Sequence, residues 1–235
     1  TVTYCDSWLD GGYDAIMLPP AKTAVYLSRI TDKLQAGVYV FGCNFPPEIL
    51  DENRRQGIFF IDYLKEDGAA YTNAAATAEG ALAEAVLSGK EMLCGQKMLV
   101  MGYGRCGQVL AQRLWAMGGD VTVYEKSQEK LAVAKAMGLG AVEAEEETLS
   151  CEPGSMTVVN CSLGNGNMES ENRLDARFWG QFGYIFNTIP QTVLGPARLS
   201  SVRHDAVLID LASAPGGFDY ACCAQNGLNA KLCSG

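Results

Sequence analysis

Short apolar runs alternate with helix-type patterns along most of the chain. Three such runs lie in the first quarter of the sequence, at residues 15–18, 38–41 and 58–61. Between the first two, apolar residues recur at helical spacing, at Ala24, Leu27, Ile30 and Leu34. Proline pairs end the first run and open the short helix pattern before the third. Because strands that alternate with helices form parallel sheets, the pattern predicts an α/β domain.

A long helix is predicted next, over residues 73–90, which are rich in Ala and Glu. Thr72 precedes it as a potential N-cap. Its apolar stripe is expected at Leu82, Val86 and Leu87. Gly80 indicates either the close approach of a ligand or partner, or a glycine that the helix tolerates at about 1 kcal/mol relative to Ala. The segment lacks the composition of a flexible linker, so we interpret it as a helix that connects two domains.

The strand and helix patterns resume after this helix in an order typical of a doubly wound parallel sheet. Strands are predicted at residues 97–101, 121–125, 140–142, 183–187, 206–210 and 228–232. Helices are predicted at residues 105–117, 128–137, 194–199 and 219–225. The periodicity is lost from about residue 152 to 182, and we interpret this stretch as an excursion. It contains a potential strand at residues 157–160, a loop at 164–167, and the apolar anchors Phe178 and Trp179.

The predicted strand at residues 97–101 leads into the pattern Gly-x-Gly-x-x-Gly, which is the sequence form of a dinucleotide-binding turn. Gly102 permits the tight turn, Gly104 lets the backbone approach a pyrophosphate, and Gly107 lets the helix and the strand pack closely. The phosphates would bind the N–H groups at the start of the helix. We therefore assign cofactor binding to the whole turn, consisting of Gly102, Tyr103, Gly104, Arg105, Cys106 and Gly107.

The residues after the next predicted strand bear on the choice between NAD and NADP. Glu125 ends that strand, where a carboxylate would accept the ribose hydroxyl groups of NAD. Lys126 follows it, and a basic residue at this turn can hold the 2'-phosphate of NADP, which Glu125 would repel. The two residues favour different cofactors, so the sequence predicts NADP or NAD without choosing between them.

Nicotinamide chemistry needs groups at the carboxyl ends of later strands, where the crevice of an open parallel sheet lies. Two such ends carry polar or glycine-rich loops that are either part of this crevice or ordinary turns. The first loop contains Asn187, Thr188, Ile189 and Pro190. The second follows Asp210 and includes Ala212 and Ser213. We therefore divide the chain into a partial N-terminal α/β domain for substrate or partner (1–72), an inter-domain helix (73–92) and a Rossmann-type dinucleotide-binding domain (93–235).

Composition and charge narrow the class of protein further. The chain carries 18 basic and 27 acidic residues, for a net charge of -9, and no run of Lys or Arg offers a footprint for nucleic acid. It contains no apolar run long enough for a membrane span. In a chain of this length, nine cysteines favour reduced thiols in the cytoplasm over a disulfide framework. The acidic run at residues 143–147 is expected to be a solvated loop, and His204, the only histidine, precedes a strand at the end of the sheet away from the crevice.

Four motifs taken together resemble the A subunit of dipicolinate synthase. They are residues 73–80 (Asn-Ala-Ala-Ala-Thr-Ala-Glu-Gly), the glycine turn, residues 187–190 (Asn-Thr-Ile-Pro) and residues 208–219, which contain Asp-Leu-Ala-Ser-Ala-Pro-Gly-Gly. The last of these is much more specific than the glycine turn, and the likeness runs from about residue 14 to the end of the chain. Members of this family begin earlier and continue further, so we expect the chain to be an excerpt truncated at both ends.

The resemblance implies a two-domain relative of alanine and 2-hydroxy-acid dehydrogenases that uses NADP or NAD. It implies that the protein acts on a small dicarboxylate, 4-hydroxy-tetrahydrodipicolinate, and dehydrates and oxidises it to dipicolinate during spore formation. The implied partner is the flavin-binding B subunit of the synthase, and a homo-oligomer is compatible with the resemblance.

Catalysis would need a base and a cationic anchor for the substrate carboxylates. Glu79 is a candidate base if it is buried, and Lys22, just beyond a predicted strand, is a candidate anchor. Each is also compatible with an ordinary solvated side chain. Two other classes stay open, namely another nicotinamide-dependent oxidoreductase related to alanine or 2-hydroxy-acid dehydrogenases, and a nucleotide-sensing domain without turnover.

Overall fold

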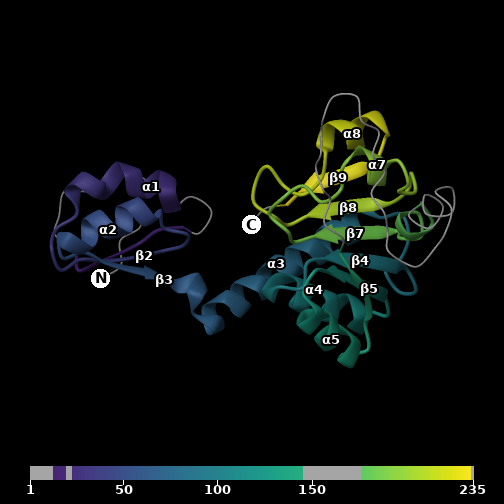
Figure 1. Cartoon of the computed structure of the whole chain (residues 1–235), viewed down its shortest axis with the longest axis horizontal. Coiled ribbons are helices and arrows are strands. Elements are labelled where there is room, and N and C mark those ends of the chain that lie inside the picture. Colours follow the sequence, from purple (N-terminus) through teal and green to yellow (C-terminus); the bar gives the residue numbers. More distant parts are fainter. Residues whose placement is uncertain (1–12, 20–22, 145–175, 234–235) are drawn as a thin grey trace. The chain divides into compact units, whose positions relative to one another are not determined.

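The computed structural model describes residues 13–19, 23–144 and 176–233 (Figure 1). The chain divides into two compact units, Thr1–Thr72 and Asn73–Gly235. Several sequence predictions lie outside the described residues: Lys22, the acidic run beyond residue 144, the potential strand at residues 157–160 and the loop at 164–167.

The first unit contains a small parallel sheet of order β1-β2-β3, with helices over one face (Figure 1). Its elements are β1 (Ala15–Met17), α1 (Thr23–Ile30), the 3-10 helix η2 (Thr31–Lys33), β2 (Tyr39–Gly42), α2 (Pro47–Arg55), β3 (Phe59–Asp62) and the 3-10 helix η3 (Tyr63–Lys65). Val40 is fully buried against α1 through Leu27 and Ile30. The predicted alternation of strands and helices is therefore correct in this unit.

Helix α3 (Asp67–Ser88) begins five residues before the predicted N-cap at Thr72. That prediction is wrong, because Asp67 supplies the acidic residue of the first turn and the alanine-rich sequence continues the helix from there. The Thr72 hydroxyl instead donates a hydrogen bond to the Gly68 carbonyl inside the helix, at 2.8 Å.

The buried face of α3 matches the predicted one only in part: Leu82 is half-buried against the core, but Val86 and Leu87 are exposed. The side chains of Val86 and Leu87 are 58% and 80% exposed. The buried stripe consists of small residues instead: Ala74, Ala78, Ala81 and Ala85, each 1% exposed or less. Alanine brings the axis of a helix close to the sheet that it covers, so the packing favours the small side chains and leaves Val86 and Leu87 in solvent.

The second unit is built on a parallel sheet of order β6-β5-β4-β7-β8-β9. Its elements after α3 are β4 (Lys97–Met101), α4 (Arg105–Ala116), β5 (Asp120–Glu125), α5 (Gln128–Ala136), β6 (Gly140–Glu143), β7 (Tyr184–Asn187), α7 (Pro196–Leu199), β8 (Val207–Asp210), α8 (Tyr220–Gln225) and β9 (Asn229–Leu232). The chain runs outward from β4 to β6 and then returns to β7, on the other side of β4. The carboxyl ends of β4 and β7 therefore meet at a topological switch point, where open α/β sheets form their crevice.

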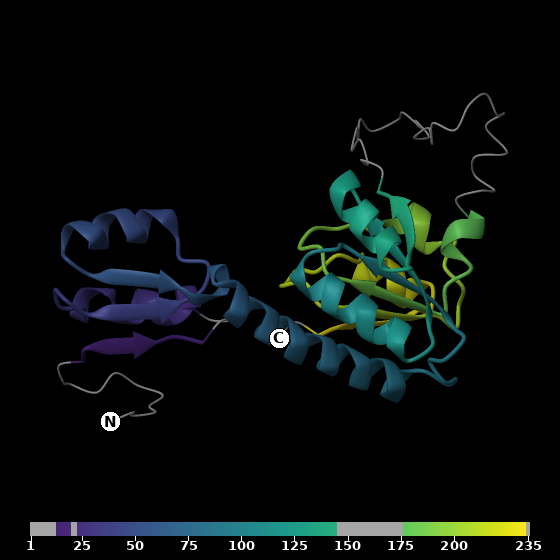
Figure 2. The ribbon, with the colours of Figure 1, turned by 90° about the horizontal axis from the view of Figure 1, so that it is seen from below.

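Side chains from alternate positions of the strands enter two cores on opposite faces of this sheet. Met98 and Val100 pack with alanine and leucine side chains of α3 and α4, and Figure 2 shows these helices with α5 in front of the strands. Leu99 and Met101 pack with a second core that contains Trp179. The central strands are thus buried on both sides, as parallel strands covered by helices require.

The anchors predicted at the end of the excursion belong to this second core. Trp179 is 1% exposed, and its ring lies edge-on to Tyr124 with centroids 5.5 Å apart. Phe178 lies edge-on to both Trp179 and Phe182 at about the same separation, 5.0 and 5.1 Å. The prediction that aromatic residues fix this part of the chain to the sheet is confirmed.

Gly80 offers a direct test of helix propensity, because it is exposed in α3 and an added Cβ would meet no atom within 4 Å. No described residue approaches Gly80 closely, so the close contact that the sequence suggested as one explanation of this glycine is not present among them. We expect Gly80→Ala to stabilise the protein by about 1 kcal/mol and to raise Tm by about 2–4 °C in a thermal melt. Gly107→Ala is the opposite control, because its Cβ would lie 2.1 Å from the Gly102 carbonyl oxygen. A lower Tm for Gly80→Ala would mean that this face of α3 is covered in solution.

Candidate functional site

The turn between β4 and α4 has the steric features predicted for its first and third glycines. Gly102 has φ 87°, which favours glycine, and an added Cβ would lie 2.5 Å from the Thr188 hydroxyl. At Gly107 an added Cβ would lie 2.1 Å from the Gly102 carbonyl oxygen. These contacts confirm that Gly102 serves the tight turn and that Gly107 lets α4 pack against the end of β4.

Gly104 differs from these two glycines because no other atoms lie close to the position of an added side chain. It is the N-cap of α4, it is exposed, and an added Cβ would meet no atom within 4 Å. The N–H groups of the first turn of an α-helix have no acceptor within the helix and carry the positive end of its dipole. The open backbone at Gly104 therefore gives an anionic group direct access to the start of α4, as the pyrophosphate prediction requires.

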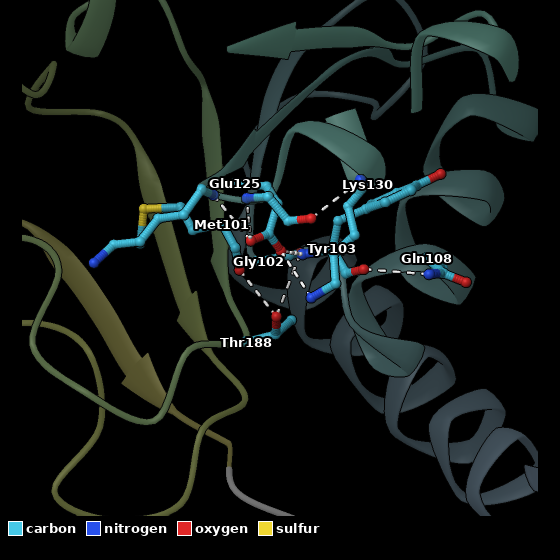
Figure 3. Close-up of polar contacts among 9 residues, drawn as sticks. Met101, Gly102, Tyr103, Gln108, Glu125, Lys130 and Thr188 are labelled. Carbon is cyan, nitrogen blue, oxygen red and sulfur yellow. Dashed lines mark hydrogen bonds and ion pairs between the residues drawn. The ribbon is translucent and has the colours of Figure 1, made fainter. Parts of the chain in front are cut away.

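The other residues of the turn lie around this opening. The Tyr103 side chain is 3% exposed, and its carbonyl accepts a hydrogen bond from the Gln108 amide at 3.2 Å (Figure 3). Arg105 is exposed in the first turn of α4. Cys106 is half-buried, and desolvation raises the pKa of its thiol despite a hydrogen bond with Thr77, so the thiol is neutral at physiological pH.

Glu125 lies at the end of β5 and ties the glycine turn to the start of α5 (Figure 3). Its Oε2 accepts hydrogen bonds from the Tyr103 N–H at 2.8 Å and the Lys130 ammonium at 3.4 Å. Its Oε1 accepts from the N–H groups of Lys126 at 2.9 Å and Ser127 at 3.2 Å. The carboxylate is thus an organising group of the site.

The charged form of Glu125 is favoured by these contacts. Desolvation alone would raise the pKa of its carboxyl group, since the side chain is only 13% exposed. The hydrogen bonds from Tyr103 and Ser127, the charge of Lys130 and the hydrogen bond from Lys126 outweigh it and lower the pKa below the usual value. The sequence identified Glu125 and Lys126 but missed Lys130. Its position on the first turn of α5, five residues beyond Glu125, was the available signal.

Thr188 connects the first strand-end loop to the glycine turn. Its N–H and its hydroxyl both donate to the Met101 carbonyl at 2.9 Å, and the hydroxyl also lies 3.4 Å from the Gly102 carbonyl (Figure 3). Ile189 follows it, and Pro190 is exposed at the end of the loop. The structure therefore brings the 187–190 segment next to the turn after β4, although the two lie more than 80 residues apart in sequence.

Two buried polar side chains, Asn187 and Asp210, hold the strand-end loops in place. The Asn187 amide donates to Asp210 at 2.8 Å and to the Ile189 carbonyl at 2.9 Å, and both side chains are 0% exposed. Asp210 also accepts hydrogen bonds from the N–H groups of Ala212 and Gly217 and from the Tyr220 hydroxyl at 2.8 Å. Every oxygen of this buried carboxylate is thereby satisfied, which rigidifies the loop that contains Ala212.

The loop after β8 has no room for larger residues beside this pair. An added Cβ on Gly217 would lie 2.1 Å from the Asn187 amide nitrogen. Burial and the Asp210 carboxylate raise the pKa of Tyr220, so its hydroxyl stays a donor. Ser213 is exposed on the same loop. The roles of Asp210 and Tyr220 were not predicted from the sequence, although a charged residue that ends an apolar strand was a usable signal.

Of the two candidate catalytic residues, the structure describes only Glu79, which does not join this group. Lys22 lies outside the described residues. The Glu79 carboxylate is 70% exposed and forms an ion pair with Arg113 at 3.0 Å, so the burial on which its role as a base depends is missing. His204 contacts the Asn226 carbonyl, at 3.3 Å, and precedes β8, as expected from the sequence.

The described residues also bear on metals and membranes. Among them, no group of three or more His, Cys, Asp and Glu side chains is arranged to hold a metal ion. None of the helices formed by these residues has the length and apolar character needed to cross a membrane.

The parallel sheet, its switch point between β4 and β7, and the glycine turn define an α/β protein of the Rossmann type. No family model matches the chain. In sequence, it resembles the A subunit of dipicolinate synthase from Bacillus subtilis (strain 168), with 27% identity over 175 residues. The aligned region is 74% of this chain and 50% of that protein, so the chain spans about half the length of this relative.

Comparison with solved structures gives the same resemblance. The crystal structure of the A subunit of dipicolinate synthase from Bacillus halodurans superposes with a TM-score of 0.73 at 22% identity, over 94% of this chain and 72% of that one. A transhydrogenase from Sinorhizobium meliloti superposes with a TM-score of 0.59 at 14% identity, over 88% of this chain and 61% of that one. The resemblance inferred from the four sequence motifs is therefore confirmed.

The lowered pKa of Glu125 predicts a pH-dependent contribution to stability. The stabilisation is fully present above the ordinary carboxyl value of 4.5 and is lost as pH falls through the lower folded-state pKa. We expect Glu125→Gln to reduce the free energy of unfolding by about 1–2 kcal/mol at pH 7, measured by urea denaturation, and the deficit to shrink on acidification towards pH 4. Glu129→Gln, at an exposed position of α5, is the control. An equal deficit at both pH values would contradict the assignment.

The buried Asp210 predicts a larger effect. In Asp210→Asn an amide NH2 replaces one carboxylate oxygen and faces donors, so we expect a loss of about 3 kcal/mol in chemical denaturation. Asp205→Asn is the matched control, because Asp205 forms an exposed ion pair with Arg203, worth at most about 1 kcal/mol. Similar losses in both variants would show that the network around Asp210 does not stabilise the loops.

Proposed function

We propose that the second unit binds a nicotinamide dinucleotide, NADP or NAD, and that the chain is part of a nicotinamide-dependent oxidoreductase. The proposal rests mainly on the N-terminus of α4, which is open at Gly104. The turn before this helix has glycine at Gly102 and Gly107, where no larger residue fits. Such a turn fits a pyrophosphate, and the open space at Gly104 leaves room for one.

The residues around the turn fit the remaining parts of such a cofactor. The first turn of α4, including Arg105 and Cys106, would hold the pyrophosphate, and Glu125 with Lys126 would face the adenosine ribose. The segments from Asn187 to Pro190 and from Ala212 to Ser213 would line the nicotinamide end. A bound nicotinamide supplies a hydride acceptor or donor. The chain's own contribution is rigidity, since Thr188, Asn187 and Asp210 hold these loops through hydrogen bonds.

The resemblance supports a more specific form of the proposal. The chain would provide the A subunit of a dipicolinate synthase, whose partner is the flavin-binding B subunit and whose substrate is 4-hydroxy-tetrahydrodipicolinate. The conversion removes one water, and then one proton and one hydride equivalent, which an acceptor must take. Lys22 is the proposed anchor for a substrate carboxylate. Glu79 is not used, because its exposed ion pair with Arg113 does not suit a base.

Dinucleotide binding can be tested with a variant that blocks the site and spares the fold. Gly104 has φ -76° and ψ -169°, which valine adopts readily, and the space around it is open. We expect Gly104→Val to weaken the binding of NADH and NADPH at least about ten-fold, because the side chain would occupy the pyrophosphate position, while Tm falls by no more than about 2–4 °C from the poorer N-cap. Isothermal titration calorimetry measures the affinities.

Gly195 provides a matched control, since it is the N-cap of α7 with φ -82° and ψ 179° and is equally open. Gly195→Val should bind both dinucleotides as the wild type does. Equal affinity of the wild type and Gly104→Val would refute the proposed site, and absence of binding by the wild type would refute the function.

The specific reaction needs a separate assay. The chain is mixed with a flavin-binding B subunit, either dinucleotide and 4-hydroxy-tetrahydrodipicolinate, and the absorbance of the aromatic product is followed. Product that depends on the chain supports the synthase assignment. Dinucleotide binding without product favours the alternatives, a different nicotinamide-dependent oxidoreductase or a nucleotide-sensing domain.

A further inference from the structure

We propose that the ion pair between Glu125 and Lys130 selects the dinucleotide, and that Lys130 favours a phosphate on the ribose 2' position over a free hydroxyl. The inference rests on the proposed binding of a nicotinamide dinucleotide and names the residue that decides its adenosine end. It assigns this role to Lys130, and not to Lys126, the residue that the sequence suggested.

The Glu125 carboxylate can accept only a limited number of hydrogen bonds. Each oxygen of an ionised carboxylate accepts about two hydrogen bonds. Oε1 already accepts from the N–H groups of Lys126 and Ser127, and Oε2 accepts from the Tyr103 N–H and the Lys130 ammonium. The carboxylate therefore has no acceptor site left for a ribose hydroxyl in this arrangement.

The four donors to Glu125 differ in how easily they can leave it. Three are backbone N–H groups at the ends of elements, fixed by the turn before α4 and by the turn before α5. The Lys130 ammonium is the fourth, and at 3.4 Å it has the longest of the four contacts. Its side chain is 44% exposed on a flexible stem, so it is the donor that a bound ribose displaces.

The Lys130 side chain is 44% exposed and that of Glu125 only 13%, so the ammonium is the more accessible partner of the pair. A ribose that approaches from solvent would therefore meet the ammonium. With a free 2'-hydroxyl, the ribose takes the carboxylate and Lys130 loses an ionic partner. With a 2'-phosphate, the ammonium exchanges the carboxylate for a more highly charged anion and keeps a charge-assisted hydrogen bond.

The surroundings of Glu125 reduce the repulsion that it would exert on a phosphate. Three backbone N–H groups point at its oxygens and offset its charge. Lys130 is the third residue of α5, a nine-residue helix, and its own N–H is bonded to the Ser127 N-cap hydroxyl at 3.4 Å. The positive end of the α5 dipole therefore lies on the same side and also favours an anion.

The inference is tested on the adenosine end alone, with adenosine 2',5'-bisphosphate and adenosine 5'-monophosphate, which differ only in the 2'-phosphate. Binding to the whole chain is measured by calorimetry. We expect the wild type to bind the bisphosphate more tightly. Lys130→Met keeps the apolar stem and removes the charge, and should raise the Kd of the bisphosphate about ten-fold or more while the Kd of the monophosphate stays the same or falls. Lys130→Arg should keep the wild-type preference.

One control variant separates the ion pair from general charge. Lys135→Met removes the same charge from the same helix at an exposed position outside the site, and should leave the ratio of the two Kd values within about two-fold of the wild type. Lys126→Met tests the competing assignment of the phosphate to Lys126, and should change this ratio less than Lys130→Met does. The inference is overturned if Lys130→Met changes both Kd values equally or not at all, or if Lys126→Met has the larger effect.

Failure of the underlying function looks different in the same experiment. If the wild type binds neither adenosine nucleotide nor NADH nor NADPH, the proposed function fails and the inference fails with it. If both dinucleotides bind but the ratio does not depend on Lys130, only the assignment of Lys130 is wrong.

Discussion

The contact between the Gly107 backbone and the Gly102 carbonyl is the constraint on which the second unit depends. Because an added Cβ at Gly107 would lie 2.1 Å from that oxygen, no other residue lets α4 approach the end of β4 so closely. The pairing of β4 with β7 places Thr188 against Gly102 and fixes the 187–190 loop at the same switch point. The close backbone contact and the strand pairing together set the position of the helix start, the turn and the neighbouring loop.

The strand ends illustrate a second way in which the fold serves the site. Asn187 and Asp210 occupy fully buried positions at the ends of β7 and β8, where an unsatisfied polar group would be strongly unfavourable. Their mutual hydrogen bond and those to the backbone remove that penalty only when both loops have one conformation. The polar groups therefore specify loop geometry, whereas the apolar residues of the same strands supply the burial.

The sequence predicted those parts of the structure that depend on local pattern. Periodicity predicted the alternation of strands and helices, turn chemistry predicted the tight turn at Gly102, and side-chain size predicted that Trp179 anchors the chain. The stripe of α3 was mispredicted at Val86 and Leu87, which are hydrophobic but exposed, because the spacing to the sheet favours alanines such as Ala81 on the buried face. Such a spacing is a tertiary property and leaves no local signal.

The candidate site shows the same limit. Glu125 could be found from its distance to the glycine turn, but its saturation by four donors depends on how the turn after β4 meets the turn before α5. Lys130 was missed for that reason. Glu79 was suggested by its neighbourhood in sequence, and its partner Arg113 lies on another helix 34 residues away.

The alanine stripe of α3 also affects how that helix is held in register. A row of alanine methyl groups forms only shallow ridges. Apolar packing alone would therefore resist movement of α3 along its own axis only weakly. Directional contacts at its rim fix the register instead: Arg113 donates to the Ala75 carbonyl at 2.9 Å, and Lys231 on β9 pairs with Glu84. Exposed polar contacts of this kind contribute little to stability elsewhere. On α3 these contacts fix the position of the helix along the sheet, which its alanine side chains do not fix.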